Sequence, residues 1–112
     1  MKKSNTITIA TILIVIAIVY FVLTNPEPST DKELAECIGK NAVLYVNLGC
    51  GHCENQKDIF GENLKYIEVV DCFYNNEECA EAEITAVPTW IINGEKITGL
   101  QSIKKLKELT GC

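Results

Sequence analysis

Residues 7–23 are almost wholly apolar, whereas the chain beyond them alternates short apolar runs with polar segments. No charged residue lies between Lys3 and Glu27. With its flanks, the run 7–23 reaches about 20 residues, enough for a helix to cross the hydrocarbon core of a bilayer. We therefore expect residues 1–25 to form a cytoplasmic stub and a transmembrane helix that ends at Asn25-Pro26.

The charges that flank the apolar run predict its orientation. Lys2 and Lys3 precede it and acidic residues follow it, so the positive-inside rule places the N-terminus in the cytoplasm and the remainder outside. The competing interpretation is a cleaved signal peptide, which usually has a shorter apolar region and a small-x-small cleavage site. No such site occurs between residues 19 and 30. We expect an uncleaved signal anchor followed by a linker at 26–30.

From residue 31 onward the periodicity switches between helical and strand patterns, which predicts one domain over residues 31–112. Asp31 or Thr30 can cap its first helix and Gly39 can end it. An Asn-Gly turn at 93–94 predicts a hairpin. The expected elements are helices at 31–39, 50–63, 77–83 and 102–109 and strands at 42–48, 66–70, 89–92 and 96–98.

This order of elements predicts the fold class. A strand, a crossover helix and a second strand imply a parallel pair, and the hairpin adds antiparallel strands. The expected fold is therefore α/β, with a central mixed β-sheet flanked by helices and preceded by one transmembrane helix. A folded part of roughly 80 residues buries a limited core, so covalent support is expected.

The charge of the exported part argues against one class of partner. From Glu27 onward the chain has fifteen acidic residues, eight lysines and no arginine, which leaves a formal charge of −7. A phosphate backbone would be repelled by that sign. We expect no nucleic-acid partner.

Six cysteines in so short a chain are a strong signal. An even number beside a membrane-targeting segment indicates an oxidising compartment. Six cysteines allow 15 pairings, and spacing alone does not choose among them. They are Cys37, Cys50, Cys53, Cys72, Cys79 and Cys112.

The segment Cys50-Gly51-His52-Cys53 lies directly after a predicted strand and at the start of a predicted helix. The nucleophile of disulfide exchange is the thiolate, and a helix N-terminus stabilises negative sulfur through its free N–H groups and dipole. Cys50 is therefore the expected nucleophile. Cys53, one turn further on, is the expected resolving thiol.

His52 is the only histidine in the chain. A protonated imidazole between the two cysteines would stabilise the thiolate and hence the reduced state, which makes the disulfide a stronger oxidant. The alternative is a solvent-exposed turn histidine without a role.

Two other interpretations of the motif are possible. A structural zinc site usually has two close ligand pairs, but six residues lie between Cys72 and Cys79 rather than two to four. An inert structural disulfide would be exposed at the junction of a strand and a helix. We expect redox activity, with no metal and no cofactor.

Several runs together resemble the thioredoxin superfamily. More closely, residues 34–112 are similar to the thioredoxin-like domains that are fused to, or work beside, bacterial and archaeal homologues of vitamin K epoxide reductase. The runs that match are LAECIGKNAVLYVN, CGHCENQKDIFG, VVDC with a later cysteine, and ITAVPTWIINGEKITGLQSIKKLKELTGC. The resemblance implies a thioredoxin-like fold and thiol–disulfide exchange.

The resemblance also implies a role for the segment at residues 87–89. Pro88 would be the cis-proline that faces the catalytic pair, with Val87 and Thr89 in the substrate-binding segment. The Val87 backbone would then pair with a substrate strand. The alternative is an ordinary trans proline that opens a strand. Trp90 is expected in the core rather than in contact with substrate.

The chain departs from the family pattern in two places. Family members commonly carry Trp before the first cysteine, but Gly49 stands here, which removes an aromatic wall from the site. Many thioredoxins place a buried carboxylate in the preceding strand, and the run AVLYVNL has none. Glu54 or Lys57 could replace it as a proton acceptor, although both are read more simply as surface residues.

Once Cys50 is assigned to Cys53, three pairings of the other four cysteines remain. Cys72 and Cys79 are separated by a single strand-to-helix connection, so a local bridge is expected. The remaining bridge would link the first and last helices, which can dock side by side. We therefore predict structural disulfides Cys72–Cys79 and Cys37–Cys112.

These features predict a membrane-anchored, extracytoplasmic thiol–disulfide oxidoreductase that acts on exported protein thiols. The resemblance implies re-oxidation by a quinone-linked membrane partner similar to vitamin K epoxide reductase. One alternative is a disulfide reductase, for example in cytochrome maturation. Another is a metal-binding or chaperone-like module without redox turnover.

Overall fold

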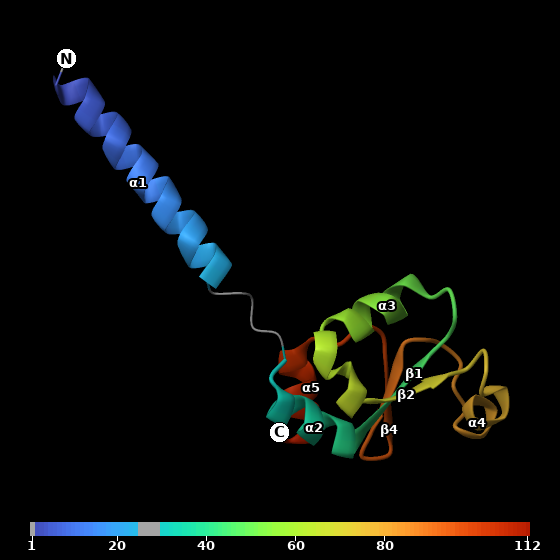
Figure 1. Cartoon of the computed structure of the whole chain (residues 1–112). Helices are drawn as coiled ribbons and strands as arrows, with labels where there is room; N and C mark the ends of the chain where they lie inside the picture. Colours follow the sequence, from blue (N-terminus) through green and yellow to red (C-terminus); the bar gives the residue numbers. More distant parts are fainter. Residues whose placement is uncertain (1, 25–29) are drawn as a thin grey trace.

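The computed structural model describes residues 2–24 and 30–112, as one long helix and one small α/β domain (Figure 1). The helix α1 covers Lys2–Thr24. The domain is built on strands β1 (Ala42–Val46), β2 (Glu68–Asp71), β3 (Thr89–Ile92) and β4 (Glu95–Thr98). Its helices are α2 (Lys32–Asn41), α3 (Gly51–Asp58), α4 (Asn76–Glu81) and α5 (Ile103–Thr110), with a 3₁₀ helix η1 (Gly61–Tyr66).

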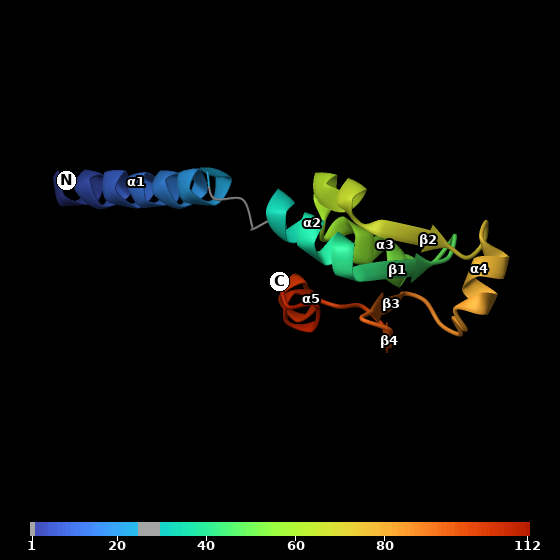
Figure 2. The same cartoon turned by 90° about the horizontal axis from the view of Figure 1, so that it is seen from below.

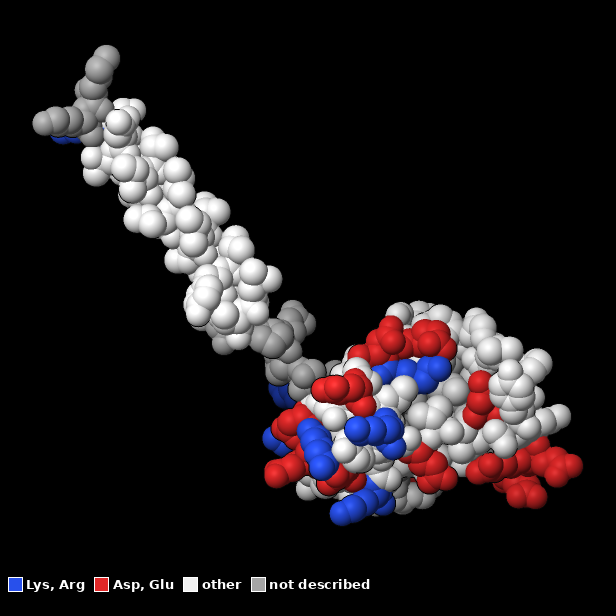
Figure 3. All heavy atoms as spheres, in the orientation of Figure 1, with Lys and Arg blue, Asp and Glu red and all other residues white. Residues whose placement is uncertain are grey.

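Helix α1 is long and apolar enough to cross a membrane, judged by length and composition. Threonine hydroxyls of this helix bond to its own backbone: Thr8 donates to the Ser4 carbonyl at 2.9 Å and Thr24 to the Tyr20 carbonyl at 2.7 Å. Such internal pairing is what a hydrocarbon environment requires. In Figure 3 helix α1 is white apart from blue atoms at its N-terminal end, whereas the domain surface carries both signs. The expected stop at Asn25-Pro26 and most of the linker at 26–30 lie outside the described residues.

The sheet has the mixed topology that the order of elements predicts. Its strand order is β2-β1-β3-β4, with β1 and β2 parallel. Strand β3 runs antiparallel to both β1 and β4, so the predicted hairpin forms around Asn93-Gly94. This confirms the α/β fold with a central mixed sheet.

Side chains alternate between the two faces of the sheet and build two core clusters. The larger cluster joins buried residues of β1 and β3 with residues of α2, α3 and α5, and the fully buried Trp90 lies within it. The smaller cluster forms around Tyr45, Val70 and Cys79, on the opposite side of β1. Helix α4 lies at the end of the domain away from α2 and α5 (Figure 2).

The environment of Tyr45 shows how acidic the α4 side is. Burial raises the pKa of the Tyr45 hydroxyl, and the carboxylates of Glu78 and Glu68 raise it further. The first turn of α4 carries Glu77 and Glu78, and its last turn has no basic residue. In Figure 3 the red side chains that project at this end are not interleaved with blue ones.

Several predicted helix boundaries differ from the structure, and the expected helix 77–83 covers only Asn76–Glu81. Helix α2 does not end at Gly39 but runs on to Asn41, while its expected cap is present: Asp31 accepts from the Leu34 N–H at 2.7 Å. The predicted helix 50–63 is split into α3 and η1, because Gly61 has a φ of +53° that no α-helix contains.

Strand β1 is two residues shorter than predicted. It ends at Val46, and the chain then turns, with the Cys50 N–H donating to the Asn47 carbonyl at 3.2 Å. Gly49 takes a φ of +80° in this turn, a conformation that glycine adopts without steric cost. The turn places Cys50 at the start of α3.

Two disulfides tie the domain together away from this turn. One joins Cys37 of α2 to Cys112, with Cα atoms 6.0 Å apart. The other joins Cys72, after β2, to Cys79 of α4, with Cα atoms 5.6 Å apart. The first closes nearly the whole domain into one loop, and the second closes only a local connection.

We predict that the two bridges differ in their contribution to stability. Removing Cys37–Cys112 with a double alanine variant should lower the free energy of unfolding by about 4.5 kcal/mol, because the bridge spans 75 residues. Removing Cys72–Cys79, which spans 7 residues, should lower it by about 2.5 kcal/mol. Urea unfolding of the detergent-solubilised chain, followed by Trp90 fluorescence, measures both. A larger loss for the local bridge would contradict this account.

We also predict that Gly39 is required for close packing of α2. A Cβ at this position would lie only 1.9 Å from the Tyr66 carbonyl oxygen, a backbone atom that cannot give way without moving the chain. Gly39→Ala should therefore lower the free energy of unfolding by about 1–3 kcal/mol. Gly51→Ala is the matched control, since a Cβ there meets nothing within 4 Å. Equal effects of the two substitutions would show that the close approach is unimportant.

Candidate active site

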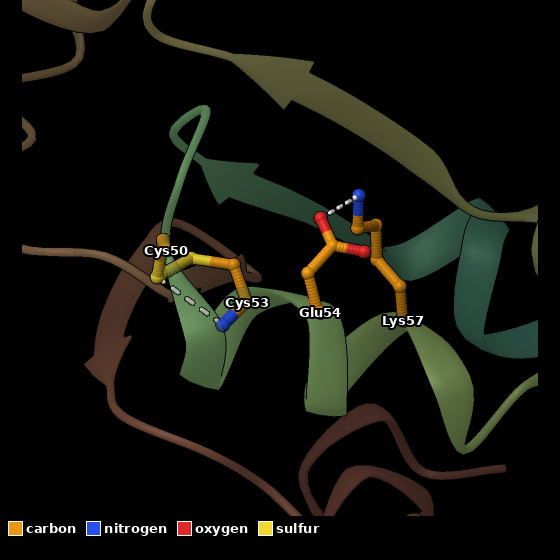
Figure 4. Close-up of polar contacts among 4 residues, drawn as sticks. All are labelled: Cys50, Cys53, Glu54 and Lys57. Atoms are coloured by element: carbon orange, nitrogen blue, oxygen red, sulfur yellow. Dashed lines mark hydrogen bonds and ion pairs between the residues drawn. A yellow bond between two sulfur atoms is a disulfide. The ribbon is translucent and has the colours of Figure 1, made fainter.

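The Cys50–Cys53 disulfide lies where β1 turns into α3 (Figure 4). Cys50 is the N-cap of α3, and its Sγ accepts a hydrogen bond from the Cys53 backbone N–H at 3.2 Å. A sulfur atom thus occupies the place where an oxygen of Ser, Thr or Asp usually caps a helix. After reduction, a thiolate on Cys50 would face free N–H groups and the positive end of the helix dipole.

The two sulfurs differ in their access to solvent. Cys53 is fully buried in the larger core cluster, whereas Cys50 is half-buried and packs at its margin. Gly51 and His52, between them, are exposed. An incoming thiol therefore reaches the sulfur of Cys50 and not that of Cys53.

The segment before β3 lies beside the pair. The Val87–Pro88 peptide bond is cis, and the Val87 carbonyl oxygen lies 4.0 Å from Cys50 Sγ. Val87 is half-buried. Thr89 is buried and its hydroxyl donates to the Ala86 carbonyl at 2.7 Å, so its side chain shapes the loop rather than facing solvent.

A hollow of about 130 Å³ adjoins this segment. It extends from the end of β1 past residues 84–87 to the Cys72 end of the second disulfide. The local bridge Cys72–Cys79 therefore also shapes the surface next to the candidate redox pair.

Strand β1 contributes no carboxylate beneath the pair, as its sequence AVLYV requires. Glu54 and Lys57 form an ion pair on α3 with 2.8 Å between oxygen and nitrogen (Figure 4). The Glu54 side chain is 62% exposed, whereas that of Lys57 is 24% exposed. Each charge thus has the other as its partner, which is the geometry of an i,i+3 surface pair.

Solved structures with the same architecture identify the fold. The oxidised thioredoxin of Plasmodium falciparum is 23% identical, with a TM-score of 0.50, over 75% of this chain and 92% of that protein. The alkylhydroperoxide reductase AhpF of Enterococcus faecalis, solved as a point mutant, is 22% identical with a TM-score of 0.50, over 76% of this chain and 46% of that one. The fold of this chain is thioredoxin-like. No protein-family model matches the chain.

A curated protein is similar in sequence to the thioredoxin-like domain. The thiol-disulfide oxidoreductase LTO1 of Arabidopsis thaliana is 37% identical over 79 residues, which cover 62% of this chain. The chain spans about a fifth of that protein, since the aligned part is 21% of its length.

The absence of a side chain at Gly49 leaves open space in the thioredoxin-like site. A Cβ there would meet nothing within 4 Å, although the φ of +80° disfavours any other residue. The neighbouring Leu48 is 58% exposed.

Sequence reasoning assigned no role to one polar residue of this region, Gln56, although it lies in the matching run CGHCENQKDIFG. It is fully buried on the same face of α3 as Cys53, three residues further on. The available signal was its spacing, because an i,i+3 neighbour of a buried residue shares its face of the helix. Its contacts are described below.

Proposed function

We propose that the chain is a membrane-anchored, extracytoplasmic thiol–disulfide oxidoreductase that uses Cys50-Gly51-His52-Cys53 to oxidise exported protein thiols. The observation that carries this proposal is the capping of α3 by Cys50 Sγ, with Cys53 buried behind it. The fold and the similarity to a thiol-disulfide oxidoreductase over the domain support the same chemistry.

The reaction is a two-electron exchange. A substrate thiolate attacks Cys50 Sγ, a mixed disulfide forms and Cys53 leaves as a thiolate that takes up a proton. A second substrate thiolate then attacks the substrate's own sulfur in the mixed bond and releases Cys50 as a thiolate. The substrate gains a disulfide, and the protein holds two more electrons as a dithiol.

Groups around Cys50 stabilise the thiolate that forms on this residue when the disulfide is reduced. The Cys53 N–H already points at the sulfur, and the exposed His52 adds positive charge when protonated. Stabilisation of the reduced form makes the disulfide a stronger oxidant. We therefore assign the oxidising direction, with Val87 at the half-buried edge of the site offering its backbone to a substrate strand.

The return of the electrons requires a disulfide-bearing acceptor. We propose a quinone-linked membrane protein resembling vitamin K epoxide reductase, because the sequence motifs resemble domains that work with such proteins. The apolar helix α1 would hold the domain near this partner. Neither nucleic acid nor a cofactor enters the proposal.

The reduction potential of the Cys50–Cys53 pair separates this proposal from its alternatives. A value of roughly −120 to −180 mV fits an oxidant, whereas one near roughly −270 mV fits a reductase. A non-redox metal-binding or chaperone-like module would instead retain zinc after purification and show no disulfide exchange in thiol titration.

We predict that Cys50 forms the mixed disulfide with partner proteins, because of the two sulfurs only Cys50 is accessible. It is the attacked sulfur in the oxidising direction and the nucleophile in the reverse direction, in which Cys53 is the resolving thiol. In membranes, Cys53→Ser should trap mixed disulfides with partner proteins, and Cys50→Ser should trap few. Non-reducing gels followed by mass spectrometry measure both. A Cys50→Ser/Cys53→Ser double variant is the control for bridges formed by other cysteines. Equal trapping by both single variants would refute the assignment.

We predict that Lys3 is cytoplasmic and Cys112 extracytoplasmic, from the charges on either side of α1. A cysteine placed at Ser4 should resist a membrane-impermeant maleimide in intact cells without an outer barrier. Cys112, freed by Cys37→Ala, should react. Lysed cells are the control, because both positions should then be labelled. Labelling of only the Ser4 position in intact cells would reverse the topology.

A further inference from the structure

Gln56 of α3 forms hydrogen bonds with two other segments of the domain, β3 and the loop before α5. Its Oε1 accepts from the Trp90 Nε1–H at 3.1 Å and from the Gln101 backbone N–H at 2.7 Å. Its Nε2 donates to the Gln101 carbonyl at 3.0 Å. Two donors face the oxygen and an acceptor faces the nitrogen, so the orientation of the amide is fixed by its partners.

These contacts join three segments around the candidate active site. Trp90 lies two residues after Pro88 on β3, and Gln101 lies between β4 and α5. The Gly99 N–H donates to the Pro88 carbonyl at 2.8 Å, and the Gln101 side-chain amide donates to the Gly99 carbonyl at 3.2 Å. A continuous set of hydrogen bonds therefore runs from α3 to the carbonyl of Pro88.

We propose that Gln56 is a positioning residue that holds the Val87–Pro88 segment against Cys50. The inference rests on the proposed function, since it concerns the geometry in which Cys50 exchanges disulfides. The Val87 carbonyl lies 4.0 Å from Cys50 Sγ, and the amide of Gln56 links α3 to the strand and the loop that hold this segment.

Loss of the amide has a direct physical consequence. An apolar side chain at position 56 would leave Trp90 Nε1, the Gln101 N–H and the Gln101 carbonyl without their partner. Buried polar groups without partners are unfavourable, so the segment around Gln101 would move to reach water. Gly99 would move with it, and the carbonyl of Pro88 would lose its donor. The Val87 backbone would then no longer be held beside the sulfur.

If Gln56 has this role, its loss should change two reaction rates of Cys50 in opposite directions: disulfide exchange with a polypeptide and alkylation by a small reagent. A substrate strand that pairs with the Val87 backbone needs the segment in place, so exchange with a polypeptide should slow. A small alkylating reagent needs no such pairing and gains access when the segment moves away. A merely structural role of Gln56 would lower stability without separating these two rates.

The test compares Gln56→Leu with Leu106→Ala in the full-length chain in detergent. Leu106 is fully buried and makes its core contact from α5, so its truncation lowers stability without removing a hydrogen bond of the network. Three quantities are measured for each variant. They are the oxidation rate of a two-cysteine reporter peptide, the iodoacetamide alkylation rate of Cys50 in the reduced protein, and the midpoint temperature of thermal unfolding.

For Gln56→Leu we expect peptide oxidation to fall about tenfold, the factor that corresponds to one lost buried hydrogen bond. The rate at which iodoacetamide alkylates Cys50 should rise about threefold or more, an effect within the range expected for one lost hydrogen bond. Leu106→Ala should change neither rate by more than about twofold while lowering the midpoint at least as much. Matching rates in the two variants, or rates that fall together in Gln56→Leu, would overturn the inference.

A second variant serves if Gln56→Leu does not fold. Trp90→Phe removes the indole N–H donor together with part of the buried ring. It should show the same pair of opposite changes at smaller size. Unchanged rates in Trp90→Phe would overturn the role assigned to its bond with Gln56. Failure of the proposed function is seen separately, because the wild-type protein would then not oxidise the peptide, while the alkylation rates would still decide the role of Gln56.

Discussion

The hydrogen bond from the Cys53 N–H to Cys50 Sγ is the interaction around which the rest of the site is arranged. A helix begins with backbone donors that need acceptors, and here a sulfur is one of them. For the sulfur to reach that place, β1 must stop at Val46 and the chain must reverse through Gly49. Once the helix starts there, Cys53 is buried and Cys50 stays at the margin of the core.

Much of this arrangement is readable from the sequence because it depends on local patterns. The hairpin around Asn93-Gly94 follows from a residue pair that favours the tight turn between two strands, and the burial of Trp90 follows from its place in an apolar strand. The position of the cysteine motif between a strand and a helix was equally visible. The two bridges outside the motif are expected because Cys72 and Cys79 are close in sequence and the first and last helices can dock side by side. The structure forms the same pairs.

The remaining features depend on contacts between distant segments. Gly39 reads as a helix end, yet it lies inside α2, where the carbonyl of Tyr66 leaves no room for a side chain. The break between α3 and η1 depends on the left-handed backbone of Gly61, which a helical periodicity hides. Gln56 reads as one more polar helix residue, since its partners at Trp90 and Gln101 are 34 and 45 residues away.

The two outer strands of the sheet, β2 and β4, leave backbone groups without a neighbouring strand. Such edges are templates on which unfolded chains can add as extra strands and aggregate. Both edges are only four residues long, and β4 begins with Glu95 and Lys96, whose ammonium reaches Glu83 at 3.6 Å. A domain proposed to bind unfolded polypeptides thus has little free strand edge on which they could add as an extra strand. The proposed substrate contact lies instead at the end of the sheet next to Cys50.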